Sequence, residues 1–282
     1  MTITGKTKLL GLIGDPVSHS LSPILHNHWF EKYGIDAVYV PLSIKAEDVE
    51  NCLPALVNAG FMGFNVTVPH KQACASLPFI NTDDFATRLK AVNTIKVEKS
   101  GDLTGYNTDG YGFLLGLDEK REASFTDGII VLIGAGGAAS PIALIMQSFN
   151  PKEIRLLNRT RSKAESLNTM LSLNATIFDW RDKEAALNGA TLIVNTTTLG
   201  MEGHSPLVLP LHVASPKAIV YDIIYNPSKT ALLEQAEEYG LQTINGLRML
   251  IYQAQEAFEH WFGILPEVTL ETIALLEGYI PR

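Results

Sequence analysis

Two side chains of opposite charge stand in polar clusters that could transfer a proton. Lys71 follows a run of alternating polar and apolar residues, 65–69, and is expected in the first turn of a helix after Pro69. Asp109 closes the polar run 105–109. An ammonium group beside a carboxylate can deliver a proton or stabilise negative charge on an oxygen. Spacing alone cannot bring the two together, so a solvated surface lysine and a carboxylate at a helix N-terminus remain open alternatives.

Other polar residues could bind a small polar ligand beside them. Ser20 and Ser22 can face one ligand from an extended loop, although Ser22 also stands where it would cap a helix. Asn65 and Thr67 alternate with apolar residues and therefore share one face of a strand. Asn93 lies between apolar residues, a setting that is also typical of a turn amide.

A glycine-rich turn in the second half of the chain predicts a phosphate site. The β-branched run 129–133 enters Gly134-Ala-Gly-Gly-Ala-Ala139, and an apolar segment of helical length follows. Such glycines let a backbone approach a pyrophosphate at a helix N-terminus. The next strand ends at the basic cluster 158–163, which contains Arg159 and Lys163 but no Asp or Glu. Because arginine attracts a 2′-phosphate, the pattern favours NADP over NAD, with an ordinary tight turn as the alternative.

Composition sets the class of protein. The chain has 282 residues, which favours two domains, and 46% of them are hydrophobic. Its net charge of −8 disfavours nucleic acid as a partner. Cys52 and Cys74 suggest buried thiols in a reducing, cytoplasmic setting. The uncharged stretch 128–151 is long enough to span a bilayer, but its glycine turn favours a strand, a turn and a helix outside a membrane. The histidine and cysteine spacings predict no metal site.

The elements that must position these residues form two α/β units. Strands alternate with helices, which predicts mostly parallel sheets with helices on both faces. Strands are expected at 8–13, 37–41, 63–66, 92–97 and near 103, then at 129–133, 154–158, 175–178, 191–195 and 219–222. Helices are expected at 22–33, 46–59, 110–117, 138–148, 162–173, 181–188, 229–239 and 246–262. The second unit is a doubly wound sheet, 118–128 is a polar connector, and the terminal helices are expected to return over the first unit and leave a cleft.

The clusters, in this order, resemble the shikimate dehydrogenase family nearly from end to end. The resemblance is carried by residues 14–23, 63–71, 91–94, 105–113, 134–137, 158–160, 195–197, 200–201, 222–227 and 246–253. It implies an N-terminal α/β substrate domain of residues 1–110 plus 246–282 and a Rossmann-type NADP domain of residues 111–245. The family reaction is the reversible reduction of 3-dehydroshikimate by NADPH, a step in aromatic amino-acid biosynthesis.

The resemblance also implies a role for each matching residue. Lys71 and Asp109 would form the catalytic pair, and Ser20 with Ser22 would hold the shikimate carboxylate. The ring hydroxyls would be contacted by Asn65, Thr67, Asn93 and Gln253, with Tyr225 nearby. Gln255 replaces a commonly small residue, which blurs which glutamine meets the substrate, but the register favours Gln253. The cofactor would be bound by Gly134, Gly136, Gly137, Ala138, Asn158, Arg159, Thr160, Lys163, Thr196, Gly246 and Met249.

Three other functions compete with this interpretation. One is a quinate/shikimate dehydrogenase of broad cofactor use, which the Asn-Arg-Thr strand end disfavours. Another is a folate-linked dehydrogenase, which the Ser-x-Ser loop disfavours. The third is a non-catalytic NADP-binding sensor. Such a protein could lose the lysine and the aspartate while keeping the glycine-rich turn, but here Lys71 and Asp109 both stand in intact motifs. A homodimer is compatible with the resemblance, but the sequence does not define the oligomeric state.

Overall fold

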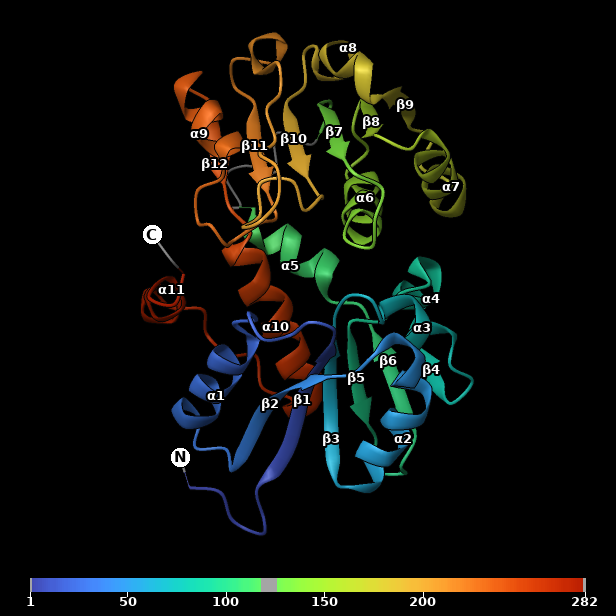
Figure 1. The fold of residues 1–282 in the computed structure, drawn as a ribbon, viewed down its shortest axis with the longest axis vertical. Helices are drawn as coiled ribbons and strands as arrows, with labels where there is room; N and C mark the ends of the chain where they lie inside the picture. The colour runs from blue at the N-terminus through green and yellow to red at the C-terminus, as the bar shows by residue number, and fades with distance from the viewer. Residues whose placement is uncertain (1, 118–125, 281–282) are drawn as a thin grey trace. The chain divides into compact units, whose positions relative to one another are not determined.

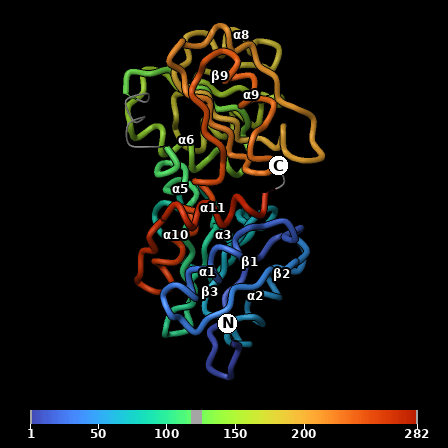
Figure 2. Tube along the Cα trace, turned by 90° about the vertical axis from the view of Figure 1, so that its left-hand side faces the viewer, coloured from blue at the N-terminus to red at the C-terminus, as the bar shows by residue number. Residues whose placement is uncertain are grey.

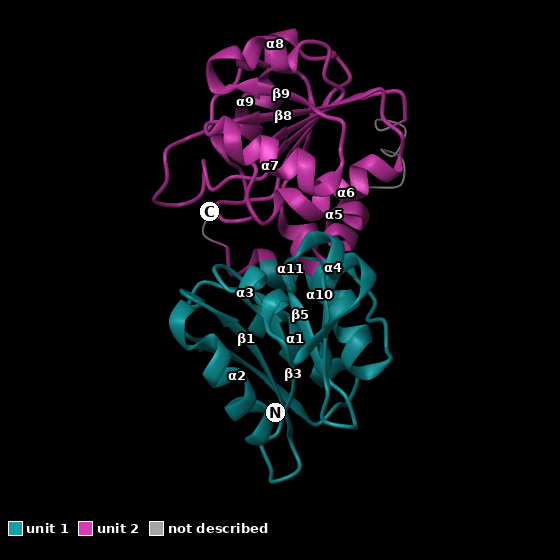
Figure 3. Cartoon of the chain, turned by 90° about the vertical axis from the view of Figure 1, so that its right-hand side faces the viewer, with its two compact units in different colours: residues 1–108, 253–276 teal, residues 109–252, 277–282 magenta. Residues whose placement is uncertain are grey.

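The chain forms two compact α/β units. The computed structural model describes residues 2–117 and 126–280, so most of the predicted connector 118–128 lies outside the described residues. Unit 1 comprises residues 1–108 and 253–276, and unit 2 comprises residues 109–252 and 277–282 (Figure 3). Each unit contains its own six-stranded sheet, and Figure 1 labels the elements.

The sheet of unit 1 has the strand order β2-β1-β3-β5-β6-β4. Only β5 runs antiparallel to its neighbours, so the expected mostly parallel sheet is present. Its strands are β1 (Lys8–Gly14), β2 (Ala37–Ser43), β3 (Phe61–Val66), β4 (Ile80–Thr82), β5 (Thr94–Val97) and β6 (Leu103–Tyr106). Its helices are α1 (Ser22–Lys32), α2 (Val49–Asn58), α3 (Lys71–Ser76), α4 (Asp84–Leu89) and parts of α10 (Leu247–Phe262) and α11 (Leu270–Glu277).

Alternation along β3 places a different core on each face of this sheet. Phe64 and Val66 join an apolar cluster that includes residues of α2, α3 and α4. On the opposite face, the Trp261 indole packs against Gly63 and donates a hydrogen bond to the Ile95 carbonyl oxygen at 3.0 Å. Helix α10 lies beside α1 in Figures 1 and 2. Phe258 of α10 contacts Phe30 of α1, with ring centroids 5.6 Å apart. The two helices thus cover one face together.

The sheet of unit 2 is entirely parallel, in the order β12-β11-β10-β7-β8-β9. Its strands are β7 (Ile129–Ile133), β8 (Glu153–Asn158), β9 (Thr176–Asp179), β10 (Leu192–Asn195), β11 (Ile219–Asp222) and β12 (Gln242–Ile244). Its helices are α5 (Asp109–Gly116), α6 (Ala139–Ser148), α7 (Arg161–Leu171), α8 (Lys183–Leu187) and α9 (Ala231–Glu238). The order reverses between β7 and β10, which is where ligands bind in open parallel sheets.

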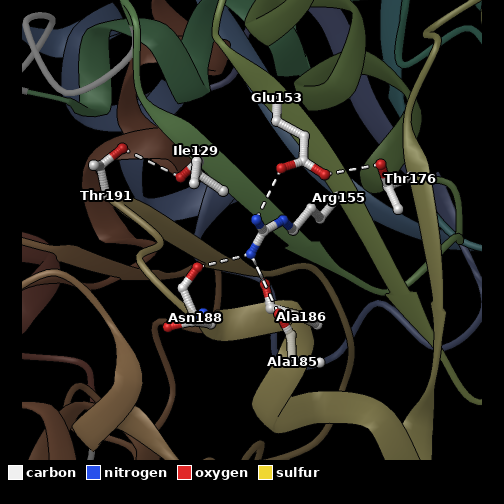
Figure 4. A network of polar contacts seen from close by, with 8 residues as sticks. All are labelled: Ile129, Glu153, Arg155, Thr176, Ala185, Ala186, Asn188 and Thr191. Atoms are coloured by element: carbon white, nitrogen blue, oxygen red, sulfur yellow. Dashed lines mark hydrogen bonds and ion pairs between the residues drawn. The ribbon is translucent and has the colours of Figure 1, made fainter.

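Arg155 of β8 ties together three elements of unit 2 (Figure 4). Its Nη1 donates to the carbonyl oxygens of Ala185, Ala186 and Asn188 at 2.8 to 3.3 Å, and its Nη2 pairs with Glu153 at 2.8 Å. A cation at the C-terminus of α8 is favoured by the helix dipole. Glu153 also accepts a hydrogen bond from Thr176, and these contacts lower its pKa. The group braces β8, β9 and α8 at the sheet edge opposite the glycine-rich turn.

Most predicted elements exist, with differences at short or irregular segments. The helix expected at 46–59 begins as a 3-10 turn, Ala46–Asp48, and α4, β4 and β12 were not predicted as elements. The strands β4 and β12 have three residues each, too few for periodicity to be visible. Cys74 is buried as expected, but Cys52 is only half-buried.

Candidate active site

The Ser20–Ser22 loop lies at the carboxyl end of β1. The predicted capping role of Ser22 is wrong: the N-cap of α1 is Leu21, and no side chain caps this helix. Ser22 is the first helical residue, and its backbone N–H donates to Ser20 Oγ at 3.2 Å. The Ser22 side chain is 4% exposed. Its hydroxyl is therefore not used for capping, which strengthens its candidacy as a ligand group.

Two buried amides occupy the same edge of the sheet. Asn65 is the last residue but one of β3, and Asn93 precedes the antiparallel β5, so both lie at the carboxyl end of β3. Asn65 Nδ2 donates to Thr94 Oγ1 at 3.0 Å and to the Asn93 carbonyl oxygen at 3.3 Å. Asn93 Oδ1 accepts from the Thr108 backbone N–H at 2.8 Å and from Thr94 Oγ1 at 3.1 Å. The two amides belong to one connected network.

Backbone hydrogen bonds bring the lysine segment to the same loop. The Val92 N–H donates to the Lys71 carbonyl oxygen at 2.9 Å. Asn93, the residue after Val92, accepts the Thr108 backbone N–H at 2.8 Å, and Asp109 follows Thr108 directly in the chain. Lys71 is the first residue of α3, as predicted, and is half-buried; Asp109 is 6% exposed.

Thr67 is a further predicted ligand of unit 1, and the structure also places the two glutamines of α10. Thr67 follows β3, and its backbone N–H donates to the Ile13 carbonyl oxygen at 2.8 Å. Gln255 is 7% exposed and donates to the Pro266 carbonyl oxygen at 2.6 Å, so it has a structural role. Gln253, two residues earlier in α10, is half-buried and remains the candidate for ligand contact.

The glycine-rich turn of unit 2 is built for close approach at the carboxyl end of β7. Gly134 has φ +108°, and a Cβ there would lie 2.6 Å from Thr196 Oγ1. Nothing lies within 4 Å of the Cβ position of Gly136 or Gly137. Ala138 is the N-cap of α6 and makes no side-chain cap. The turn therefore leaves backbone N–H groups available to an anion, and a pyrophosphate fits it.

The same sheet edge carries three more cofactor candidates, Thr196, Gly246 and Met249, and the substrate candidate Tyr225. Thr196 follows β10, and its hydroxyl donates to the Ile133 carbonyl oxygen at 2.7 Å. Tyr225 follows β11 and is half-buried. Gly246 follows β12, and any side chain there would collide with the backbone of Ile223. Met249 is buried one turn later in α10.

The basic strand end separates into engaged and unengaged side chains. Arg161 contacts Glu165 at 2.9 Å and Asp179 at 3.3 Å. Arg159 and Lys163 are exposed and form no ion pair within the described part of the chain. Asn158 Nδ2 donates to the Thr160 carbonyl oxygen at 2.7 Å and so shapes the turn. Arg159 and Lys163 are therefore the two cations of this cluster that are available to bind a phosphate.

A buried carboxylate that carried no predicted role organises the loops after β10 and β11. Asp222 is 0% exposed and accepts hydrogen bonds from Thr230 Oγ1 at 2.7 Å, Asn195 Nδ2 at 3.0 Å and the Ile224 N–H at 3.1 Å. Burial raises the pKa of Asp222 to about 6, although these three donors oppose that rise. Asn195 in turn accepts from Thr197, beside Gly134. The residue lies within the family motif 222–227, but the motif did not reveal its contacts.

One pocket in unit 1 lies apart from the predicted site residues. A pocket of about 580 Å³ lies among α2, β4 and the β5–β6 turn, lined by Phe79, Asn81 and Leu103 among others, and contains none of the predicted site residues. No helix among residues 2–117 and 126–280 is long and apolar enough to cross a membrane.

Family models match three segments of the chain. The shikimate dehydrogenase substrate binding domain matches residues 12–95, shikimate/quinate 5-dehydrogenase matches residues 117–202, and the shikimate 5′-dehydrogenase C-terminal domain matches residues 246–270. The shikimate dehydrogenase (NADP(+)) of Roseobacter denitrificans is 42% identical over 97% of this chain and 99% of its own length. The chain belongs to the shikimate dehydrogenase family.

Solved structures of the family support the fold and show its range. A shikimate dehydrogenase in complex with NADP+ is 36% identical, with a TM-score of 0.86 over 99% of this chain and 96% of that one. A quinate dehydrogenase from Corynebacterium glutamicum in complex with NAD is 30% identical, with a TM-score of 0.87 over 96% and 99% of the two chains. Overall similarity therefore does not separate the two activities, and the local chemistry of the sites must do so.

Proposed function

We propose that this protein is an NADP-dependent shikimate dehydrogenase that catalyses the reversible reduction of 3-dehydroshikimate to shikimate in the pathway to aromatic amino acids. One observation supports this proposal most. The chain is similar over nearly its whole length to NADP-dependent relatives, and it has polar residues at the carboxyl ends of the strands in both sheets. The polar edge of unit 1 supplies the proposed substrate groups, and the edge of unit 2 supplies the cofactor groups.

The cofactor assignment is supported by the end of β8. Arg159 and Lys163 are exposed there, and neither has a carboxylate partner among the described residues. Arginine binds a phosphate through charged, often bidentate hydrogen bonds. The 2′-phosphate that distinguishes NADP from NAD would satisfy these cations. The pyrophosphate would lie on the turn formed by Gly134, Gly136 and Gly137.

We propose that Lys71 and Asp109 are the catalytic pair. NADP, when bound in its reduced form, supplies the hydride that forms the new C–H bond. Reduction of the ketone then places negative charge on its oxygen, and the Lys71 ammonium donates the proton or stabilises that charge. Asp109 would hold the ammonium in place. The backbone contacts of Lys71 with Val92, and of Thr108 with Asn93, support this pairing because both segments are anchored to the same loop.

The substrate groups follow from the same edge. Ser20 and Ser22 would bind the carboxylate, and Ser22 is suited to this because its hydroxyl does not cap α1. The ring hydroxyls would be contacted by Asn65, Thr67, Asn93 and Gln253, with Tyr225 nearby. A cytoplasmic location remains a prediction from the sequence, and a homodimer remains compatible with it.

A four-way assay tests the proposal. Cofactor reduction is followed at 340 nm with shikimate or quinate, each with NADP or NAD. We expect shikimate with NADP to give the highest kcat/KM by at least tenfold. A preference for quinate or for NAD would instead favour the broad-specificity enzyme, and complete absence of turnover would favour a cofactor-binding sensor.

A further inference from the structure

Tyr39 of β2 is a buried tyrosine whose hydroxyl is directed at a proposed substrate ligand. Its side chain is 1% exposed, and its hydroxyl donates a hydrogen bond to Asn65 Oδ1 at 2.8 Å. The two residues come from strands separated by β1, so nothing in the local sequence connects them. No other protein atom within the described residues accepts a hydrogen bond from this hydroxyl.

The orientation of the Asn65 amide is determined by its neighbours. The amide atom that faces the Asn93 carbonyl oxygen must be nitrogen, because a carbonyl oxygen can only accept. The atom that faces Tyr39 is therefore the oxygen, and the tyrosine must be the donor. Thr94 Oγ1 accepts the second Nδ2 hydrogen and passes its own hydrogen to Asn93 Oδ1. Asn93 Oδ1 is fixed in turn by the Thr108 N–H.

The hydrogen bonds that the Asn65 amide already makes limit what it can offer a ligand. Both hydrogens of its Nδ2 are already donated, to Thr94 and to the Asn93 backbone. The capacity that remains is a lone pair on Oδ1, which can accept one hydrogen bond. A hydroxyl can donate to it, whereas a ketone oxygen cannot. Asn65 therefore suits a ring position that carries a hydroxyl in both the oxidised and the reduced substrate.

An imidazole ring supports Tyr39 from behind. His26 of α1 is 0% exposed and stacks on the Tyr39 ring, with centroids 4.5 Å apart and planes 20° apart. Burial lowers the pKa of His26 to about 3; the nearby Asn65 side chain raises it, but by less. Neither ring nitrogen has a well-formed hydrogen bond within the described residues. His26 is thus a neutral stacking partner of Tyr39, and it also contacts the indole of Trp261, whose ring centroid lies 5.3 Å from that of His26.

We propose that Tyr39 is a positioning residue, held by the stacked His26 ring, whose hydroxyl aims the Asn65 amide so that Asn65 Oδ1 accepts a hydrogen bond from a ring hydroxyl of the substrate. The proposal rests on the function proposed above, in which Asn65 contacts such a hydroxyl. It adds a specificity determinant, because the aimed oxygen selects a donor at that ring position and rejects a carbonyl there.

A double-mutant cycle of Tyr39→Phe and Asn65→Ala tests the proposal. We expect Tyr39→Phe to raise KM for shikimate roughly tenfold and to change kcat less than twofold, because the contact is the same in ground and transition states. The same factor should appear in KM for 3-dehydroshikimate, since the hydroxyl is present in both. In an Asn65→Ala background, Tyr39→Phe should change KM less than twofold.

Tyr33→Phe is the matched control. Tyr33 is also in unit 1, and its hydroxyl accepts the Glu267 N–H at 2.9 Å, so this variant loses a comparable hydrogen bond away from the amide network. Its KM should equal that of the wild type. Thr94→Val, which removes the next link of the network, should raise KM as Tyr39→Phe does. Melting temperatures of all variants separate these effects from loss of folding.

The outcomes discriminate between the two proposals. An unchanged or lower KM in both Tyr39→Phe and Thr94→Val, or an undiminished effect of Tyr39→Phe without Asn65, would overturn the positioning role while leaving the enzyme assignment intact. If the wild type binds shikimate without turnover, the same cycle is measured as Kd ratios, and only the catalytic assignment fails. Absence of both binding and turnover in the wild type would overturn the two together.

Discussion

The cofactor preference rests on two arginines that stand two residues apart and differ in their contacts. Arg161 is already paired with Glu165 and Asp179, whereas Arg159 has no acidic partner among the described residues. Both changes to alanine remove one positive charge from the same helix start. Any difference between them therefore reports a direct contact with the 2′-phosphate rather than the general electrostatic field.

The magnitude follows from the contact that would be lost. A hydrogen bond to a charged group contributes about 1.5–3 kcal/mol. Arg159 is exposed, so screening by salt favours the lower end, about 1.5 kcal/mol, which corresponds to roughly a tenfold rise in Kd. We expect Arg159→Ala to weaken NADPH binding by about this factor and NADH binding less than twofold. Arg161→Ala should weaken NADPH binding no more than about threefold, because only long-range attraction is lost.

Fluorescence titration of each variant with NADPH and NADH at fixed ionic strength measures these values. Repeating the NADPH titrations at higher salt should reduce the Arg159→Ala effect, as expected for a screened charge contact. Equal weakening of both cofactors by Arg159→Ala would refute the 2′-phosphate assignment. So would an Arg161→Ala variant that loses NADPH as selectively as Arg159→Ala does, since the ion pairs of Arg161 would then be irrelevant.

Four further perturbations have defined outcomes. Lys71→Ala should lower kcat by orders of magnitude with little change in KM for shikimate, and a loss confined to KM in steady-state assays would make Lys71 a binding residue. Ser22→Ala should chiefly raise KM for shikimate; an unchanged value, measured in the same assays, would remove it from the carboxylate site. Asp222→Asn should flatten the pH dependence of the free energy of unfolding, measured with urea. The pKa of Asp222 in the folded protein, about 6, lies above its ordinary value of 3.8. Its contribution to stability is therefore complete below pH 4, and about 3 kcal/mol of it is lost as pH rises through 6. Arg155→Met should destabilise the protein by about 3–5 kcal/mol, because it leaves three carbonyl groups and a carboxylate without their cation. A decrease of less than about 1 kcal/mol in the free energy of unfolding, measured with urea, would show that these contacts are dispensable.

The periodic parts of the fold could be predicted because their signal is local. The run 129–133 is buried on both faces of a parallel sheet, so it is apolar throughout, and β7 has the predicted bounds. Lys71 was placed in the first turn of a helix by the preceding proline, and α3 begins there. The three-residue strands β4 and β12 are recruited by neighbouring strands, which a local pattern cannot show.

The candidate site residues were predicted through motifs, but their contacts within the fold could not be. The capping role of Ser22 failed because Leu21 takes the N-cap position and Ser20 Oγ accepts the Ser22 N–H. Gln255 binds the Pro266 carbonyl oxygen, eleven residues away, which leaves Gln253 as the candidate ligand. Such outcomes depend on which atoms the folded chain brings together.

Tyr39 shows why a polar network is less predictable than a sheet. In sequence it is one aromatic residue in an apolar strand, which indicates only burial. Its significance depends on a carbonyl oxygen of the loop before β5, which forces the Asn65 amide to present its oxygen toward β2. That constraint links Tyr39 to Asn65, 26 positions away, and Asn65 to Asn93, 28 positions away, through individual atoms that a sequence motif does not specify. A family motif can therefore identify Asn65 as a ligand, but whether Asn65 donates or accepts follows only from its buried partners.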